Sequence, residues 1–468
     1  MNKRLYGVLL ALCIALGCLA GCSKTPAAPA ETAAPVAQEP ASQATGAATV
    51  EAEVIDYAGT VKLDMNSSTL KQEVTVKSYI DGDTTHFYVP TSVVDNGLLK
   101  ARYLAVNTPE STGKIEEWGK KASNFTREKL QSAESIIIES DDTKWNLDST
   151  GGRHLVWVWY KPAGSDSYRN LNIELLQNGL SVASKSGENQ YGEICMSAIA
   201  QAKAQELHVH SKQKDPDFFY GDAIPVTLKE LRINTKAYEG MKVAFEGVIT
   251  RENSQTVYVE DYDSETDMYY GMTVYYGFNL TGTGLEILNE GNRVAFVGSV
   301  QYYETGGTWQ VSDIKYVDMR PNDPNNIQLI SEGNAPANTP ITAQQINEET
   351  VTIEVWAGQD SEISTIQTFE YAHLALSTSV SMENLFVSDV YTTTNEDSSS
   401  KGAMTLTCKT EDGQYVSIRT VVLRDADGNT ITADAYRGKT INVQGIVDYF
   451  SGEYQIKVFT PDDITVVG

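Results

Sequence analysis

Acidic residues and arginines that could act together on a phosphodiester lie close together in one part of this sequence: Asp81-Gly82-Asp83, Arg102, Asn107-Thr108-Pro109-Glu110 and Arg153. Hydrolysis of a phosphodiester needs groups that neutralise the phosphate charge, a base that takes a proton from water and, commonly, a divalent cation. Guanidinium groups bind phosphate oxygens in pairs, and carboxylates act as bases or as ligands of hard cations. The residue types therefore predict phosphodiester hydrolysis at a site that holds a metal ion.

The order and spacing of these motifs resemble the thermonuclease family, whose best-known member is staphylococcal nuclease. The resemblance continues through Trp118–Ser123, Leu171–Leu180 and Ala200–Lys203, and it covers roughly residues 71–212. It implies an OB-like β-barrel with added helices. It also implies a secreted, calcium-dependent endonuclease that cuts both DNA and RNA at the 5′-O–P bond.

The resemblance assigns calcium to three residues of this chain. Asp83 matches one carboxylate ligand, Asn107 stands where the family usually has a second acid, and the backbone carbonyl of Thr108 matches a third ligand. Calcium accepts amide oxygens as well as carboxylates, but its affinity falls when the ligands carry less negative charge. We therefore expect a calcium site that is weakened by Asn107.

The resemblance also assigns the catalytic roles. Glu110 matches the family's glutamate, which acts as the general base or orients the attacking water, and Arg102 and Arg153 match its two phosphate-binding arginines. A planar guanidinium binds two phosphate oxygens at once, which lysine cannot reproduce. We expect both arginines to act mainly on the reaction rate.

The segment before Arg153 departs from the family pattern. The family commonly has an aspartate, a variable residue and then Tyr-Gly-Arg, whereas this chain has Asp148-Ser149-Thr150-Gly151-Gly152. The aromatic side chain that helps to hold the nucleotide is therefore missing, which affects the expected substrate affinity and base preference. Tyr191 and Trp157 are the candidates that could replace it.

The N-terminus predicts export. Lys3 and Arg4 precede an apolar run from Leu5 to Cys18, the pattern of a secretory signal. Leu19-Ala20-Gly21-Cys22 resembles a bacterial lipobox, in which the cysteine is lipidated and becomes the first residue of the mature protein; the alternative is a chance cysteine near an ordinary cleavage site. Residues 23–55 are rich in Ala, Pro, Glu and Thr and cannot bury a core, so we expect an extended tether. The domains would then be anchored at the extracytoplasmic face of the cell membrane.

Few cysteines are left for structural roles. Of the five, Cys13 and Cys18 lie in the predicted signal and Cys22 would be acylated, which leaves Cys195 and Cys408 in separate predicted domains. The histidines form no cluster with metal-ligand spacing. We therefore expect two buried free thiols and neither a disulfide scaffold nor a zinc site.

The C-terminal half carries an internal repeat. Pro225-Val226-Thr227-x-x-Glu230 recurs as Pro340-Ile341-Thr342-x-x-Gln345, and each predicts a capping box that opens a short helix. Gly298–Tyr303 aligns with Gly445–Phe450, and each predicts the first strand of a hairpin. Short strands with interior glycines predict two small closed barrels, which resemble the OB-fold modules beside nuclease domains in Gram-positive surface nucleases.

We therefore expect a mainly β chain with some α-helix, made of an OB-like nuclease barrel with added helices followed by two OB-fold-like β-barrels. The predicted segments are a signal peptide with its lipobox cysteine, a tether, a thermonuclease-like domain and two barrel domains, at 1–22, 23–55, 56–215, 221–330 and 336–468. Within the last of these domains, residues 336–468, the segments 347–370 and 395–400 are interpreted as insertions.

The barrels contain aromatic residues that could stack on the bases of a single strand, as OB-folds often do. The candidates are Tyr258, Tyr275, Tyr276, Tyr302, Tyr303, Trp309, Tyr449, Phe450 and Tyr454. An aromatic at an alternating strand position can equally belong to the core. The formal net charge of −26 is concentrated beyond residue 212, and a negative surface repels phosphate. Contact with protein or cell-wall polymer would explain these acidic modules equally well.

Taken together, these patterns predict an exported, membrane-anchored, calcium-dependent nuclease with DNA and RNA as substrates. The alternative is a catalytically inactive surface lipoprotein that binds nucleic acid, protein or cell-wall polymer, as Asn107 and the missing tyrosine would suggest. Glu110 discriminates between them, because a protein that only binds has no need of a general base.

Overall fold

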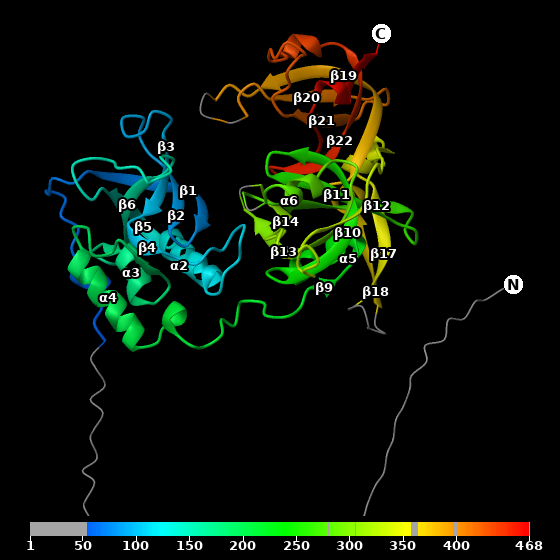
Figure 1. Cartoon of the computed structure of the whole chain (residues 1–468). Coiled ribbons are helices and arrows are strands. Elements are labelled where there is room, and N and C mark those ends of the chain that lie inside the picture. Colours follow the sequence, from blue (N-terminus) through cyan, green and yellow to red (C-terminus); the bar gives the residue numbers. More distant parts are fainter. Residues whose placement is uncertain are drawn as a thin grey trace, which may run out of the picture. The chain divides into compact units, whose positions relative to one another are not determined.

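Three five-stranded β-barrels with the same strand order follow one another along the chain (Figure 1). The computed structural model describes residues 54–467 except 279, 305, 357–363, 396, 397 and 399. The predicted signal peptide, Cys22 and nearly all of the tether lie outside the described residues and stay predictions. The predicted fold class, mainly β with OB-like barrels, is confirmed.

The first barrel closes through a parallel pair between its third and last strands. Its order is β3-β2-β1-β5-β6, and β3 pairs with β6. The strands are β1 (Lys71–Asp81), β2 (Thr84–Tyr88), β3 (Leu98–Tyr103), β5 (Ala133–Glu139) and β6 (His154–Pro162). The remaining strands are β4 (Ala105–Asn107), β7 (Arg169–Asn170) and β8 (Val182–Ser184), and the helices are α1 (Tyr57–Thr60), α2 (Gly119–Gln131), α3 (Leu171–Gln177) and α4 (Gly192–Ala204).

The helices of this domain pack on the barrel through one shared core. Ala122 and Leu130 of α2, Leu175 of α3 and Ala198 of α4 join the barrel residue Trp159 in that core. Burial of such apolar side chains contributes roughly 1.5–3 kcal/mol each for the larger ones. The core therefore fixes α2 and the loop before it against the end of β1, where the predicted site begins.

The second barrel has the same cyclic order, written from its first strand as β10-β11-β12-β14-β13, and β10 and β13 pair to close the ring. Its strands are β10 (Lys242–Asn253), β11 (Thr256–Asp263), β12 (Met268–Tyr275), β13 (Arg293–Tyr303) and β14 (Thr308–Ser312), with β9 (Ile224–Pro225) and β15 (Gln328–Ser331) added at its edges. Its helices are α5 (Leu228–Asn234) and α6 (Thr283–Ile287). Thr227 caps α5 by accepting a hydrogen bond from the Glu230 N–H, which is one half of the predicted capping box.

The third barrel has the order β19-β20-β21-β23-β22 and closes between β19 and β22. Its strands are β19 (Ser379–Thr392), β20 (Met404–Lys409), β21 (Tyr415–Thr420), β22 (Thr440–Phe450) and β23 (Glu453–Val458), with β16 (Thr339–Pro340) and β24 (Ile464–Val467) at its edges and the helices α7 (Ala343–Asn347) and α8 (Tyr371–Leu374). Thr342 and Gln345 form the predicted capping box of α7.

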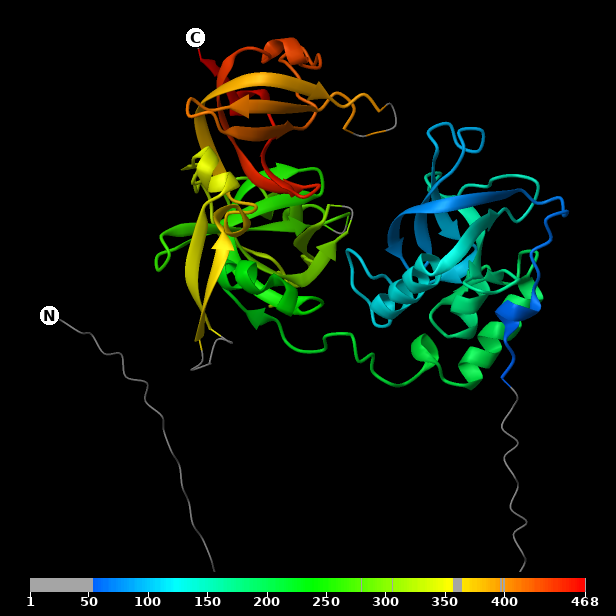
Figure 2. The same ribbon diagram turned by 180° about the vertical axis from the view of Figure 1, so that it is seen from behind.

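An inserted hairpin joins the second and third barrels. Strands β17 (Thr350–Trp356) and β18 (Ser364–Glu370) pair with each other and lie beside the second barrel (Figure 2). Ile353 and Val355 of this hairpin are buried in the core of the second barrel, although they follow the first helix of the third in sequence. The hairpin therefore packs into the core of the second barrel, whereas the third barrel has a core of its own.

Candidate active site

The turn between β1 and β2 places two carboxylates side by side. The Asp81 carboxylate accepts a hydrogen bond from the Asp83 N–H at 3.1 Å. A Cβ atom at Gly82 would lie 2.9 Å from Ala122 and from Thr108, so only glycine fits this close approach. Thr126 of α2 holds the Gly82 carbonyl at 2.6 Å. Asp81 and Asp83 are consequently both buried.

Asp83 is the central group of the site. Its carboxylate accepts hydrogen bonds from the Thr108 N–H at 2.9 Å and the Thr84 hydroxyl at 3.1 Å, and it forms an ion pair with Arg102. Burial raises the pKa of Asp83 to about 7, and the negative charge of Asp81 adds to this effect while Arg102 opposes it. A further positive charge at this position would favour the ionised carboxylate.

Arg102 connects two of the predicted calcium ligands. It lies on β3 opposite Thr84 of β2. One nitrogen of its guanidinium contacts Asp83 and the other donates to the Asn107 side-chain oxygen at 2.6 Å. The arginine thus holds together a buried carboxylate and an exposed amide, and its side chain is largely buried.

Glu110 and Arg153 complete the cluster. Glu110 is exposed, yet enough protein surrounds its carboxyl for desolvation to raise its pKa, and the negative charge of Asp81 raises it further. The positive charges of Arg102 and Arg153 oppose that shift. The parallel pairing of β3 with β6 sets Ala101 opposite His154, which brings Arg153 to the same edge of the barrel as Arg102.

Arg153 is oriented by an acid that precedes it. Its Nε donates to the Asp148 carboxylate at 2.7 Å. Although desolvation acts in the opposite direction, hydrogen bonds from Thr150 and Arg153 lower the pKa of Asp148 to about 2. The segment that departs from the family pattern therefore still contributes an aspartate that holds the arginine.

The comparison with protein families agrees with this geometry. The family described as staphylococcal nuclease homologue matches residues 100–211. Residues 100–211 form a staphylococcal nuclease homologue domain. The match includes Arg102, Glu110 and Arg153, and it begins after the turn that carries Asp83. No curated protein matches the chain.

The structure thus brings every predicted site residue of the nuclease homologue domain into one region: Asp83, Arg102, Asn107, Thr108, Glu110 and Arg153. The prediction named Asp81 and Asp148 but assigned neither of them a role. Asp81 was recognisable as the first acid of the Asp-Gly-Asp motif. Asp148 stood in the segment noted for its lost tyrosine, but no local pattern shows that its side chain turns back to an arginine five residues later.

Neither candidate for the missing aromatic faces this site. Trp157 is fully buried and donates through its indole nitrogen to Asp141 at 2.9 Å. Tyr191 packs edge-on against Trp157 and Trp159, and its hydroxyl lies 3.1 Å from Glu139. The suggestion that Trp157 replaces the family's aromatic is therefore wrong, because its ring belongs to the core.

The residues present fit a calcium ion in their chemistry. The buried Thr108 hydroxyl has no hydrogen-bond partner among the described residues, and it lies next to the turn that carries two buried carboxylates. Calcium prefers such carboxylate, carbonyl and amide oxygens. Across the part of the chain that the structure describes, no group of three or more His, Cys, Asp or Glu residues could hold a metal ion, so an ion here would depend on the oxygens of Asn107 and Thr108.

Two further predictions outside the nuclease site can be compared with the structure. Cys195 and Cys408 are buried free thiols, as predicted. Burial raises the pKa of each thiol to about 12, which makes both inert at neutral pH. Of the helices that the structure describes, none is long and apolar enough to cross a membrane.

Proposed function

We propose that this chain is an exported, membrane-anchored, calcium-dependent nuclease that hydrolyses phosphodiester bonds of DNA and RNA. The match to the staphylococcal nuclease homologues supports a nuclease-type activity. The observation that carries the finer proposal is the gathering of Glu110, Arg102 and Arg153 around the buried Asp81 and Asp83. This combination supplies a base, two phosphate ligands and an acidic pair that favours a cation.

Each residue has a chemical task in this proposal. Arg102 and Arg153 bind the oxygens of the phosphate and stabilise the negative charge that builds up in the transition state. To reach the phosphate, Arg102 exchanges its contact with the exposed Asn107 for one with the substrate. Glu110 accepts the proton of the attacking water, and its raised pKa makes it a stronger base than an ordinary glutamate.

Calcium would be held by Asp83, Asn107 and the Thr108 carbonyl, and when bound it supplies positive charge that neutralises the phosphate. Asn107 is neutral, so the affinity for calcium should be lower than that of a site with two acids. Asp148 keeps Arg153 oriented toward the cluster through its bond to Nε.

The proposal is tested with the fragment 54–468, which spans the compact unit of the chain. Single-stranded DNA and RNA are incubated with increasing calcium, with a chelator control. We expect calcium-dependent cutting, and a loss of about 10²–10⁴-fold in kcat for Glu110→Gln. The matched control is Glu128→Gln, an exposed glutamate on α2, which should cut at the normal rate.

The opposite outcome has a clear meaning. If the folded fragment binds oligonucleotides without cutting them at millimolar calcium, the full chain would be a catalytically inactive surface lipoprotein, the alternative that the sequence left open. Equal cutting by Glu110→Gln would instead show that another group is the base.

The membrane anchor is a separate part of the proposal and rests on the lipobox that ends at Cys22. Its test is metabolic labelling with a radioactive fatty acid. We expect Cys22→Ser to abolish the labelling and to release the protein from the membrane fraction, and an unlabelled wild-type chain would refute the anchor.

A further inference from the structure

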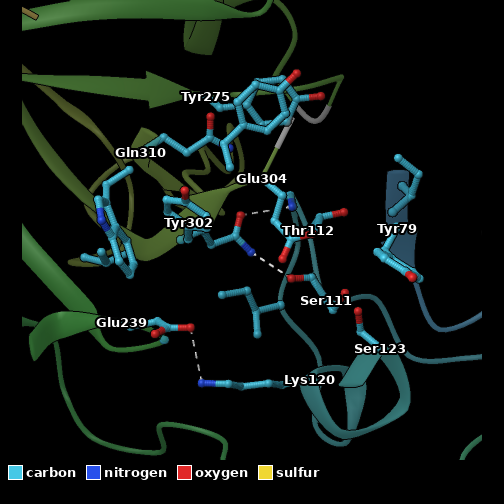
Figure 3. A pocket seen from close by; sticks show the side chains of 18 of the residues that line it. Tyr79, Ser111, Thr112, Lys120, Ser123, Glu239, Tyr275, Tyr302, Glu304 and Gln310 are labelled. Atoms are coloured by element: carbon cyan, nitrogen blue, oxygen red, sulfur yellow. Dashed lines mark hydrogen bonds and ion pairs between the residues drawn. The ribbon is translucent and has the colours of Figure 1, made fainter. Parts of the chain in front are cut away.

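A cavity of about 870 Å³ lies between the nuclease homologue domain and the second barrel. Figure 3 shows Tyr275 and Tyr302 of the second barrel on one side and Tyr79, Ser111 and Lys120 of the nuclease domain on the other. Ser111 directly follows Glu110 in sequence. The cavity therefore begins at the loop that carries the proposed base.

Specific polar contacts hold this loop against the second barrel. The buried Gln301 side chain donates to the Ser111 carbonyl at 3.0 Å and accepts from the Gly113 N–H at 3.2 Å. Such a reciprocal pair fixes both the position and the direction of the loop. At the rim, Nζ of Lys120 lies 3.4 Å from Oε1 of Glu239. Figure 3 marks this ion pair with a dashed line. The barrel is thus attached next to the candidate site.

A second cavity of about 460 Å³ lies beside the first one and is lined partly by the third barrel. Lys236, Tyr302 and Trp309 line both cavities, whereas Tyr449 and Tyr454 line only the second. The two cavities therefore share a wall of side chains. Together they lead from the Glu110 loop past the second barrel to the third.

The shared wall and its far end carry the same aromatic arrangement. Tyr302 pairs across the strands with Trp309 at a ring-centroid distance of 5.0 Å, and Tyr449 pairs with Tyr454 at 4.9 Å. These are equivalent positions of the internal repeat. Tyr302 is 45% exposed, so its ring is available for stacking, whereas Tyr449 is partly buried and packs against the core of the third barrel.

Exposure separates the stacking candidates from the core. Tyr258 and Tyr276, which the sequence grouped with them, are only 5% and 7% exposed and belong to packed regions. Tyr303 and Phe450 are 46% and 59% exposed and directly follow Tyr302 and Tyr449. Exposed aromatic rings at the end of a hairpin suit base stacking, which is worth about 1–3 kcal/mol per base.

The charge of the two cavities differs from that of the chain as a whole. Their lining cations are Lys120, Arg127, Lys236 and Arg232, and their lining acids are Asp217, Glu239 and Glu304. Lys120 is paired with Glu239 and Arg127 with Glu304, and Arg232 is buried with its guanidinium on the Gly271 and Leu376 carbonyls. The lining is therefore nearly neutral, whereas the chain has a formal net charge of −26. No ion pair of Lys236 is found within the described residues, and its ammonium group can therefore contact a phosphate.

We propose that the two adjacent cavities bind single-stranded nucleic acid and so hold the part of the substrate that extends beyond the cleaved bond. This proposal rests on the proposed nuclease function and adds a binding path to it. The rings supply stacking for any base, and the ammonium group of Lys236 contacts the backbone. The path runs from the Glu110 loop to Tyr302 and then to Tyr449.

The test uses the fragment 54–468 with Glu110→Gln, which prevents cutting, and fluorescent oligothymidylates of increasing length. We expect Tyr302→Ala and Tyr449→Ala each to raise the Kd for a long oligomer about 10-fold. Since Tyr302 lies nearer the site, its substitution should begin to matter at a shorter length than that of Tyr449. The matched control is Tyr415→Ala, a 55% exposed tyrosine of the third barrel outside both cavities, which should leave the Kd unchanged.

Several outcomes would overturn the proposal. One is an unchanged Kd for the oligothymidylate in both variants, with the same melting temperature as the parent. Another is that the two variants keep their affinity for the oligothymidylate but lose binding to a hexamer of β-1,4-linked N-acetylglucosamine, which would make the path a glycan site. Should Tyr302→Ala fail to fold, Lys236→Gln takes its place, and an unchanged Kd there would equally refute the path. A failure of the nuclease function is distinguishable, because it appears as absent cutting by the unsubstituted fragment.

Discussion

The nuclease barrel and the second barrel have the same strand order, and each contains an arginine paired with an aspartate. In the nuclease barrel Arg102 contacts the fully buried Asp83. In the second barrel Arg293 forms two hydrogen bonds to Asp261 at 2.9 and 3.2 Å, and Asp261 is partly exposed. An arginine–aspartate ion pair is therefore buried in the nuclease barrel and partly exposed to solvent in the second barrel.

The difference lies in what surrounds the pair. Asp83 has Asp81 as a buried neighbour, so the carboxylates together exceed the charge of the arginine. At the corresponding turn of the second barrel, β10 and β11 are joined through Asn253-Ser254-Gln255, which contains no acid. A barrel of this kind supports many functions, and the rim residues decide which one it has.

The largest effect should come from substitution of Arg102, with Arg293 as the comparison. Arg102→Lys removes the fork that binds phosphate and Asp83 together, and we expect kcat to fall about 10³-fold, or about 4 kcal/mol of transition-state stabilisation. Arg293→Lys should leave kcat unchanged, because its pair is exposed and worth about 0–1 kcal/mol to stability. Single-turnover cleavage of DNA by both variants measures this difference. An equal loss in both would mean that the pairs differ only in burial and not in function.

The sequence predicted the site better than it predicted the contacts between domains. Asp83, Arg102 and Glu110 belong to local motifs whose spacing is fixed by two strands and a loop. Gln301 lies in the internal repeat, but the repeat does not predict its contact with Ser111, because Ser111 is distant in the chain and the contact depends on how whole barrels meet.

The aromatic residues show the same limit of sequence reasoning. Alternation along a strand assigns two faces but does not say which face of a closed barrel lies inside. Tyr258 and Tyr302 were therefore indistinguishable as stacking candidates, and only the structure shows Tyr258 packed near Phe459 of the third barrel.

The buried carboxylate of Glu260 sharpens the comparison, because no arginine pairs with it among the described residues. Glu260 of β11 is 2% exposed and accepts hydrogen bonds from the Ser379 N–H at 2.7 Å, the Ser379 hydroxyl at 2.8 Å and the Ala337 N–H at 2.8 Å. Glu260→Ala would leave these donors unsatisfied, and we expect a loss of about 3 kcal/mol in the free energy of unfolding.

The measurement for Glu260 is urea unfolding of the fragment 54–468, followed by fluorescence. Glu246→Ala, an exposed position of the same barrel, is the matched control and should change stability by no more than about 0.5 kcal/mol. If Glu260→Ala instead lowered cleavage with normal stability, this carboxylate would act in function, and its contrast with Asp83 would be lost.

The smallest effect concerns the charge around Glu110. Its pKa is raised by desolvation first, then by Asp81, and also by the nearby Glu116. Because Glu110 must be deprotonated to act as a base, kcat/KM should fall as the pH drops through this raised pKa. Glu116→Gln removes one negative charge, so the protonated form of Glu110 becomes less favourable and the acid limb should move to lower pH by less than about one unit.

The pH dependence of kcat/KM at saturating calcium measures this shift, and the amide oxygen of the new glutamine can still accept the Glu110 N–H that Glu116 accepts at 3.2 Å. Glu128→Gln on α2 serves as the control for a general loss of negative charge. The contrary result is an acid limb that stays in place in Glu116→Gln but moves in Glu128→Gln. The group that titrates in this limb would then respond to distant charge and not to Glu116. Because the charge of Glu116 acts directly on Glu110, the base would have to be a group other than Glu110.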